Sequence, residues 1–254
     1  METVIILSRK GGVGKTATAH ALGAALMKRK KRVLFVDADG QSNLTLTMKA
    51  DEEQSNLYDV LSKESTIKKA IQETEGGYII PGNEMLHAAD ITLNGADKNL
   101  ILREALKEVS KQFDYCIIDT PAALGVVTMN CLIAADKIIV PLQADIYSLQ
   151  GIARMVEALE TVKANCGSKA TISGFLVTRY NARTVLSKQM LEDLEKIAKS
   201  LKTRVYKSKI RECTAIKEAA LQQTDIYSYA SRSNAAKDYK AFVEEFIKQK
   251  QKEI

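Results

Sequence analysis

The sequence lacks several features that would mark particular classes of protein. It has no Trp, and aromatic residues make up only 6% of the chain, so nothing indicates a stacking platform for sugars or bases. No apolar run approaches the roughly 20 residues that a transmembrane helix needs. The first predicted strand begins almost at Met1, which leaves no room for a signal peptide. We therefore expect a soluble cytoplasmic protein.

Cysteine and histidine are too few and too scattered to indicate a metal centre. The four cysteines form no C-x-x-C pair, and neither histidine has a second Cys or His ligand near it in sequence. We expect the cysteines to be reduced and packed, and the histidines to be ordinary helix or loop residues. The residues concerned are Cys116, Cys131, Cys166, Cys213, His20 and His87.

Linkers rich in Pro and Gly and internal repeats are also absent, whereas apolar residues make up 46% of the 254 residues. Short apolar strands alternate with amphipathic helices, which is typical of a parallel sheet covered by helices on both faces. We predict a single α/β domain over residues 1–254 with a mostly parallel, twisted sheet. The predicted strands are Thr3–Leu7, Arg32–Val36, Tyr78–Ile80, Tyr115–Ile118, Lys137–Val140, Ala170–Val177 and Thr203–Tyr206. The longest predicted helices are Thr16–Lys30, Asn99–Val109, Leu149–Lys163, Val185–Leu201 and Asn234–Lys248.

The segment KGGVGKT, residues 10–16, joins the first predicted strand to the first predicted helix. Its glycines let the backbone curl so that successive N–H groups point at phosphate oxygens, and the helix N-terminus adds partial positive charge. Lys15 can reach the β- and γ-phosphates of a nucleotide, and the Thr16 hydroxyl suits Mg²⁺. The strict pattern has glycine where this chain has Arg9. The strand before the segment and the helix after it favour a phosphate site over a chance glycine turn, and identify a P-loop NTPase.

Three carboxylates lie where ligands of parallel sheets bind, at the carboxyl ends of strands. Asp119 follows an apolar strand and can hold a magnesium-bound water, while Asp37 and Asp39 can assist the metal and orient an attacking water. A single Asp at a strand end is more often a turn or a helix cap, and Asp39-Gly40 is a good turn sequence. Both interpretations stay open on the residues alone.

Positive charge is concentrated in the C-terminal third of the chain. The net charge is +6, yet residues 163–254 hold 19 Lys and Arg against 10 Asp and Glu. Within 196–217 there are eight basic residues and one acid, Glu212. Such a run is commonly a solvated helix face, but it also fits a surface for a polyanion such as nucleic acid.

The loop with Lys10 resembles the deviant Walker A motif of the ParA/MinD family of P-loop ATPases, and the resemblance covers essentially the whole chain. Two late blocks are similar to those of the ParA/Soj partitioning branch. The similar segments are VDADGQSNLT (36–45), FDYCIIDTPAALG (113–125), ADKIIVPLQADIYSLQG (135–151), LVTRYNARTVLS (176–187) and IRECTAIKEA (210–219).

The resemblance implies Mg²⁺-dependent ATP hydrolysis in a nucleotide-sandwich homodimer. Lys10 would be the signature lysine that reaches phosphates held by the partner subunit, and Asp39 would position the hydrolytic water. Asp37 would support the magnesium site, and Asp119 would bind magnesium through water, beside Thr16. The implied catalytic residues are Lys10, Lys15 and Asp39. The implied ATP contacts are Lys10, Gly11, Gly12, Val13, Gly14, Lys15, Thr16 and Ala17.

The resemblance also implies sequence-independent binding of double-stranded DNA, which agrees with the basic C-terminal third, and a nucleoid-associated protein. Arg183 falls where the branch carries a DNA-binding arginine. Ala215 takes the place of a second one, and nearby basic residues could supply its charge: Lys209, Arg211 and Lys217. No helix-turn-helix extension precedes the ATPase region, so specificity would come from a ParB-like centromere-binding partner that stimulates hydrolysis.

Two residues depart from the family pattern. Ala17 replaces a second hydroxyl residue, which puts one contact to the α-phosphate in doubt, and Gly40 stands where proline is common.

Three other functions remain open. The first is a MinD-like membrane-cycling ATPase, because the last predicted helix carries an apolar stripe, although such stripes usually face a protein core. The second is an iron–sulfur member of the superfamily, which would need a second cysteine to match Cys131. The third is a small-molecule kinase or synthetase on the same scaffold.

Overall fold

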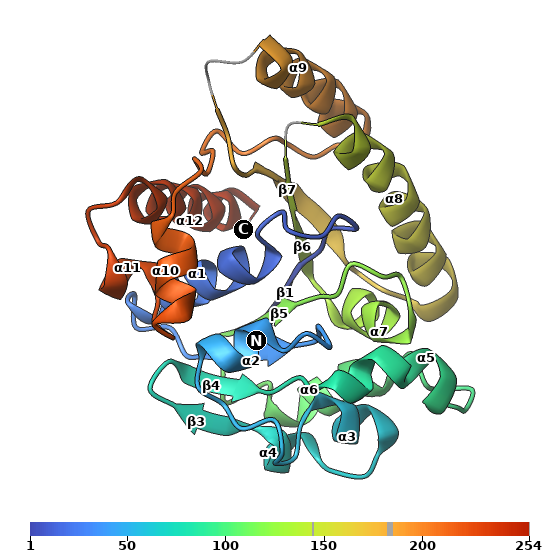
Figure 1. Ribbon diagram of the computed structural model, residues 1–254. Coiled ribbons are helices and arrows are strands. Elements are labelled where there is room, and N and C mark those ends of the chain that lie inside the picture. Colours follow the sequence, from blue (N-terminus) through green and yellow to red (C-terminus); the bar gives the residue numbers. More distant parts are fainter. Residues whose placement is uncertain (144, 182–184, 254) are drawn as a thin grey trace.

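Seven strands form one sheet through the centre of the protein, in the order β3-β4-β2-β5-β1-β6-β7 (Figure 1). The computed structural model describes residues 1–143, 145–181 and 185–253. The strands are β1 Glu2–Ile6, β2 Val33–Asp37, β3 Gln72–Thr74, β4 Gly77–Ile80, β5 Tyr115–Asp119, β6 Lys137–Leu142 and β7 Thr171–Val177.

The central strands are parallel and almost wholly apolar. Strand β1 lies between β5 and β6 and pairs with both in parallel, and among the described strands only β3 runs antiparallel to its neighbour. The register sets Ile6 opposite Asp119, and Asp119 opposite Asp37. Three strand ends therefore meet at one edge of the sheet, where the chain places the glycine loop and the two carboxylates.

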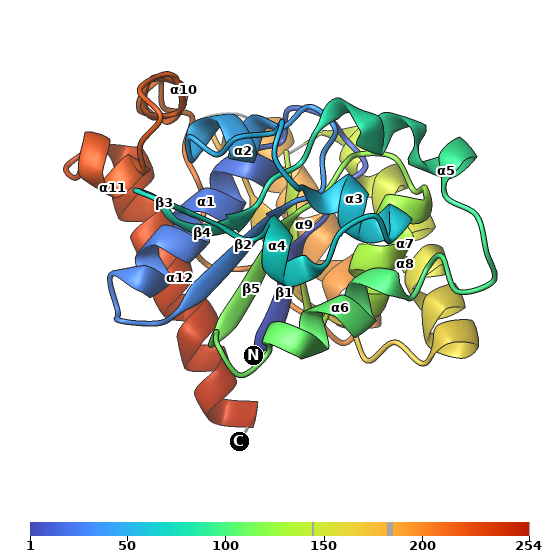
Figure 2. The ribbon, with the colours of Figure 1, turned by 90° about the horizontal axis from the view of Figure 1, so that it is seen from below.

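Successive strand residues point to opposite faces of the sheet, and each face has its own core. Ile5 and Leu7 belong to the core on one face, whereas Val4 and Ile6 belong to the core on the other. Figure 2 shows α1 and α12 on one side of the sheet and α6, α7 and α8 on the other. The fold is thus the predicted α/β arrangement with helices on both faces.

Long helices cover the two faces of the sheet, and shorter helices pack beside them. The long helices are α1 Lys15–Met27, α6 Ile101–Val109, α7 Val126–Ala134, α8 Ile146–Cys166, α9 Val185–Ser200 and α12 Asn234–Glu253. The short ones are α2 Asn43–Thr47, α3 Leu57–Ser62, α4 Ile67–Ala70, the 3-10 helix η1 Glu84–Ala88, α5 Ala89–Thr92, α10 Ala215–Leu221 and α11 Ile226–Tyr229.

Two details of the predicted fold are wrong. The predicted strand Thr203–Tyr206 does not form, because there Val205 makes only an isolated bridge to Phe175. Strand β3 was not predicted, since its sequence QET carries no apolar alternation and it forms by pairing with β4 across the turn at 74–77.

The apolar stripe of the last helix faces the core. Ile247, the last member, is partly buried, and the other members are buried in the core that α1 and the sheet share: Ala235, Ala236, Tyr239, Phe242, Val243 and Phe246. The stripe of α12 therefore faces the protein core, as such stripes usually do. Across the described residues, no helix combines the length and the apolarity needed to span a bilayer.

The cysteines are free thiols. Cys116 and Cys131 lie inside the core, and burial raises the pKa of Cys131 to about 12. Both side chains are therefore packed and protonated at neutral pH. Cys166 and Cys213 are partly exposed.

Candidate functional site

The loop after β1 has the backbone conformation that its glycines predict. Gly12 and Gly14 adopt positive φ angles of 71° and 86°, in a region that residues with a side chain rarely occupy. Gly14 is also the N-cap of α1, so the first free N–H groups of that helix open toward the loop. This geometry is the cradle for phosphate that the sequence indicated.

Residues far away in sequence hold the loop in place. The Thr178 hydroxyl, at the end of β7, donates a hydrogen bond of 2.8 Å to the carbonyl oxygen of Val13. In α1, Thr18 shares a hydrogen bond of 3.2 Å with the hydroxyl of Tyr239 from α12. Thr178 and Tyr239 were not predicted as site residues, because they lie more than 160 residues from the loop.

Negative charge is buried directly beside the loop. Asp37 and Asp119 are both fully buried. Burial raises the pKa of Asp119, and the charge of Asp37 raises it further, whereas Thr16 and Lys15 act in the opposite direction. Lys15 itself is only 8% exposed. The site therefore holds two buried carboxyl groups beside one buried lysine, and burial disfavours the charged form of Asp119 unless a cation neutralises it.

This arrangement fits a divalent cation. The two carboxylate oxygens of Asp119 are buried, and neither has a hydrogen-bond partner among the described residues. Such orphaned acceptors are costly in a protein interior unless a cation or its bound water reaches them. Thr16 and Asp119 would hold Mg²⁺ there, and the ion would neutralise charge on the nucleotide phosphates.

The oxygens of Asp37 already accept hydrogen bonds, and its support of the magnesium site stays a prediction. Its Oδ2 accepts both the backbone N–H and the hydroxyl of Thr45, each over 2.8 Å, and its Oδ1 accepts the N–H of Asp39 over 3.2 Å. The Thr45 hydroxyl accepts in turn from the N–H of Gly82 over 2.9 Å. Burial raises the pKa of Asp37 to about 6, against the opposing effect of these bonds. Asp37 thus anchors the segment that carries Asp39.

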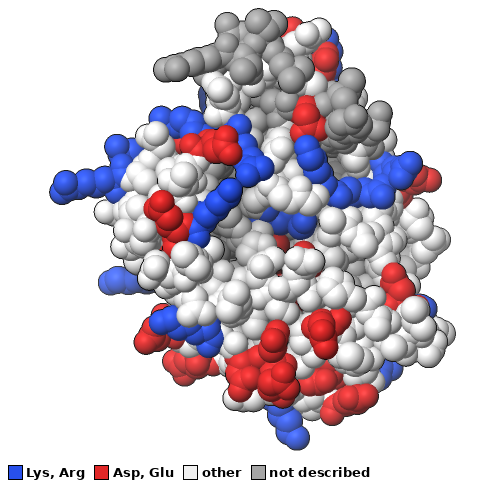
Figure 3. Space-filling model, in the orientation of Figure 1, with Lys and Arg blue, Asp and Glu red and all other residues white. Residues whose placement is uncertain are grey.

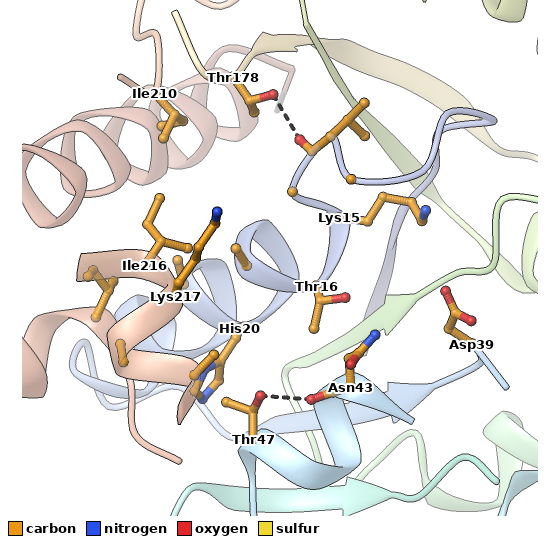
Figure 4. A pocket seen from close by; sticks show the side chains of 18 of the residues that line it. Lys15, Thr16, His20, Asp39, Asn43, Thr47, Thr178, Ile210, Ile216 and Lys217 are labelled. Atoms are coloured by element: carbon orange, nitrogen blue, oxygen red, sulfur yellow. Dashed lines mark hydrogen bonds between the residues drawn. The ribbon is translucent and has the colours of Figure 1, made fainter. Parts of the chain in front are cut away.

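Asp39 lies on the wall of the pocket, two residues beyond the strand. Its Oδ1 accepts the N–H of Gln41 over 3.1 Å, which is the turn that Asp39-Gly40 suggested. Its side chain also lines the same pocket as Lys15 and Thr16 (Figure 4). Asp39 can therefore form the turn with its Oδ1 and still present its side chain to the pocket.

Lys10 is held within its own chain. Its ammonium group lies 2.6 Å from Asp145 Oδ2 and donates to Gln143 Oε1 over 3.4 Å. The Gln143 amide donates to the carbonyl oxygen of Gly12 over 3.2 Å. The loop after β6 therefore contacts both the lysine and the glycine loop.

The glycine loop opens into a cavity of about 960 Å³. One wall is the start of α1 with Asp39. The opposite wall comes from the two residues after β7, the segment that leads into α10, and α10 itself (Figure 4). Thr178 and Ile210 are at one end, and His20 and Thr47 at the other. The volume and the phosphate cradle together suit a nucleotide.

The predicted DNA-binding residues have different surroundings. Arg183 lies outside the described residues. Lys209 stands over the ring of Tyr180, with 5.7 Å from Nζ to the ring centroid. The Arg211 guanidinium donates two hydrogen bonds to Asp238 and its backbone N–H donates a third, while Lys217 lines the nucleotide cavity. Contacts of these four residues with DNA stay predictions.

The fold and this site define a P-loop ATPase. A family model described as "AAA domain" matches residues 1–173. The chain is 36% identical to the sporulation initiation inhibitor protein Soj of Bacillus subtilis, over 93% of this chain and 94% of that protein. It is 30% identical to the chromosome partitioning protein ParA of Myxococcus xanthus, over 96% and 87% of the two chains.

A solved structure of a similar protein agrees with this fold. Cobyrinic acid a,c-diamide synthase from Mycobacterium smegmatis, crystallised with an ATP analogue and magnesium, is similar with a TM-score of 0.85 and 28% identity. The alignment covers 100% of this chain and 97% of that one. The chain belongs to the ParA/MinD family of P-loop ATPases, in its ParA/Soj branch. Its nucleotide is ATP and its metal ion is Mg²⁺.

Proposed function

We propose that this chain is a DNA-partitioning ATPase that works as an ATP-dependent homodimer on bulk DNA. The observation that carries this proposal is the similarity to Soj over 93% of the chain, combined with a Lys10 that stands beside the glycine loop. ATP binding would assemble the dimer on DNA, and hydrolysis would release it. A cycle of this kind moves or spaces the cargo DNA.

Dimerisation would bring Lys10 to the phosphates held by the opposite subunit. In the single chain the Lys10 side chain is 36% exposed, and its ammonium group forms an ion pair with Asp145. A second subunit could therefore reach this side chain from the solvent. A cation that arrives with the second subunit adds charge only in the closed dimer. This couples nucleotide binding to assembly, because the site is incomplete in one chain.

Hydrolysis would proceed by in-line attack of water on the γ-phosphorus. Asp39 accepts a hydrogen bond from that water and orients its lone pair, while the bond from the γ-phosphorus to the bridging oxygen breaks and leaves ADP. Lys15 and the loop N–H groups stabilise charge on the β- and γ-phosphate oxygens. Lys10 would stabilise the same charge from the other subunit.

DNA would bind to the basic part of the surface. Figure 3 shows Lys and Arg side chains gathered around the upper half of the molecule, in the region of α10, α12 and the cavity mouth. Asp and Glu gather instead at the lower edge, in the region of α3 and α4. Phosphate neutralisation by such a surface gives binding that is independent of sequence and sensitive to salt. Arg183, Lys209 and Arg211 are the proposed contacts.

The proposal includes a separate partner and a place in the cell. A ParB-like protein bound to a centromere site would stimulate hydrolysis and supply the specificity that bulk DNA binding lacks. The ATP-bound dimer would then reside on the nucleoid. The alternative of a membrane-cycling ATPase draws little support from α12, because its apolar stripe is buried against the core.

Asp39→Ala tests the proposed cycle. The variant should bind ATP normally and accumulate as a dimer on DNA, because the water that attacks the γ-phosphate is no longer oriented. Gel filtration and DNA pull-down after incubation with ATP measure both properties. Steady turnover by Asp39→Ala, at the rate of the unmodified chain, would remove Asp39 from the mechanism.

Arg183→Ala tests the DNA surface. The variant should lose affinity for DNA while dimerising normally with ATP. Lys68→Ala is the matched control, since Lys68 is an exposed lysine on α4 at the acidic edge. Equal losses of DNA affinity in the two variants would show that the loss comes from the lower net charge of the protein and not from a DNA-binding surface at Arg183.

A further inference from the structure

One basic side chain that lines the nucleotide cavity, Lys217, lies outside the glycine loop and forms no ion pair with a described carboxylate. Besides Lys15, the basic residues that line the cavity are Arg179, Arg211 and Lys217. Arg179 lies 3.6 Å from Glu212, and Arg211 binds both oxygens of Asp238. No described carboxylate forms an ion pair with Lys217.

Lys217 lies on α10, a short helix with one buried side. Ala215 and Ala219 face the core, with 8% and 3% of their surface exposed, whereas the Lys217 side chain is exposed to the cavity. Ile216 is partly buried against the same core. In Figure 4, the Lys217 side chain extends from α10 into the cavity, opposite the glycine loop. The position of α10 therefore brings this ammonium group within the cavity.

The position of Lys217 along the cavity indicates which part of the nucleotide it meets. Lys15 and Thr16 take the β- and γ-phosphates, and the α-phosphate follows on the side of the base. On that side the next residue of α1 is Ala17, which lines the cavity but carries no hydrogen-bond donor beyond its backbone N–H. Ile216 and Lys217 of α10 line the same cavity as Ala17, so α10 and the start of α1 border one space.

We propose that Lys217 is a nucleotide-binding residue whose ammonium group binds the α-phosphate from α10. The proposal deepens the nucleotide site described above and rests on its assignment to ATP. It assigns Lys217 to the nucleotide, in place of the DNA contact expected from its position in a basic stretch. A charged donor opposite a phosphate oxygen is among the stronger hydrogen bonds that a protein forms.

The test is equilibrium binding of ADP and ATP to the full chain in the absence of DNA. Lys217→Ala should raise the Kd for ADP and for ATP by the same factor, about 5- to 20-fold, since both nucleotides carry the α-phosphate. Lys217→Arg keeps the charge and should stay within about threefold of the unmodified chain. Lys240→Ala, on the exposed side of α12 and outside the cavity, should leave both values unchanged.

Two outcomes would overturn the proposal. The first is an unchanged Kd for both nucleotides in Lys217→Ala. The second is a loss for ATP alone, which would place the ammonium at the γ-phosphate. Lys15→Ala in the same assay separates this failure from failure of the site itself, because normal ADP and ATP binding by Lys15→Ala would mean that the nucleotide does not occupy this loop.

Discussion

Thr45 donates both its backbone N–H and its hydroxyl to a single oxygen of Asp37, each over 2.8 Å. The hydroxyl also accepts the N–H of Gly82 over 2.9 Å. One buried side chain, 2% exposed, therefore joins the end of β2, the helix α2 and the residues after β4. These hydrogen bonds also determine where Asp39 lies, because Asp37 accepts the backbone N–H of Asp39.

Thr45→Val should destabilise the fold and slow ATP turnover. Valine keeps the shape but removes the hydroxyl, which leaves the buried N–H of Gly82 without its acceptor and Asp37 with one bond fewer. We expect a loss of about 1–3 kcal/mol in the free energy of unfolding. Urea denaturation measures it, together with kcat for ATP. Thr161→Val is the control, because Thr161 lies outside the cavity and its hydroxyl donates to the Glu157 carbonyl within α8. Equal losses in both variants would contradict the role of these hydrogen bonds.

Asp145→Asn should strengthen ATP-dependent dimerisation. The substitution removes the carboxylate that holds Lys10 at 2.6 Å within its own chain, so Lys10 leaves for the opposite subunit at lower cost. The pair is partly exposed, so we expect the dimer Kd to fall by only about two- to fivefold. Sedimentation with ATP on an Asp39→Ala background measures it without turnover. Asp97→Asn breaks the remote Lys63–Asp97 pair as a control, and weaker dimerisation in Asp145→Asn than in that control would contradict the prediction.

His87 and Gly40 should be coupled in catalysis. A Cβ atom on residue 40 would lie 2.8 Å from His87 Nε2, so an alanine there displaces the imidazole from beside the Asp39 segment. His87→Ala should therefore lower kcat when residue 40 is glycine and change it little in the Gly40→Ala background. The coupling energy from the four kcat values should be about 0.5–1 kcal/mol. The same relative loss in both backgrounds would mean that the two residues act independently.

His20 should make the protein less stable in weak acid. Burial lowers the pKa of His20 below the usual 6.5, with Asp225 acting in the opposite direction. The unfolded chain then binds the proton more tightly than the folded one, so the free energy of unfolding falls as pH drops below about 6.5. Denaturation at pH 7.5 and 5.5 should show a smaller fall for His20→Gln than for the unmodified chain. His87→Gln, at an exposed position, controls for the loss of an imidazole, and identical falls in all three proteins would refute the prediction.

Much of the site could be predicted because it lies at the ends of apolar strands. The runs before Lys10, Asp37 and Asp119 are buried on both faces, so their length and order are visible in the sequence, and parallel pairing then brings their ends together. The glycine loop was predictable for a similar reason, since Gly12 and Gly14 mark the two positive φ angles.

The remaining features depend on contacts that no local pattern records. Thr45, Thr178 and Asp145 reach their partners only after the sheet has formed, and the last of these lies 135 residues from Lys10. Charge counting placed Lys217 in a basic stretch, but only the packing of α10 shows that it lines the cavity. Likewise, strand β3 depends on its partner β4 and not on its own sequence.

The central claim is that ATP turns this chain into a DNA-binding dimer. The most direct measurement is binding to random-sequence double-stranded DNA across a salt titration, with ATP, with ADP and without nucleotide. We predict tight binding with ATP alone, which weakens steeply and linearly on a logarithmic salt scale. Equal binding in all three nucleotide states, or none in any of them, would contradict the account.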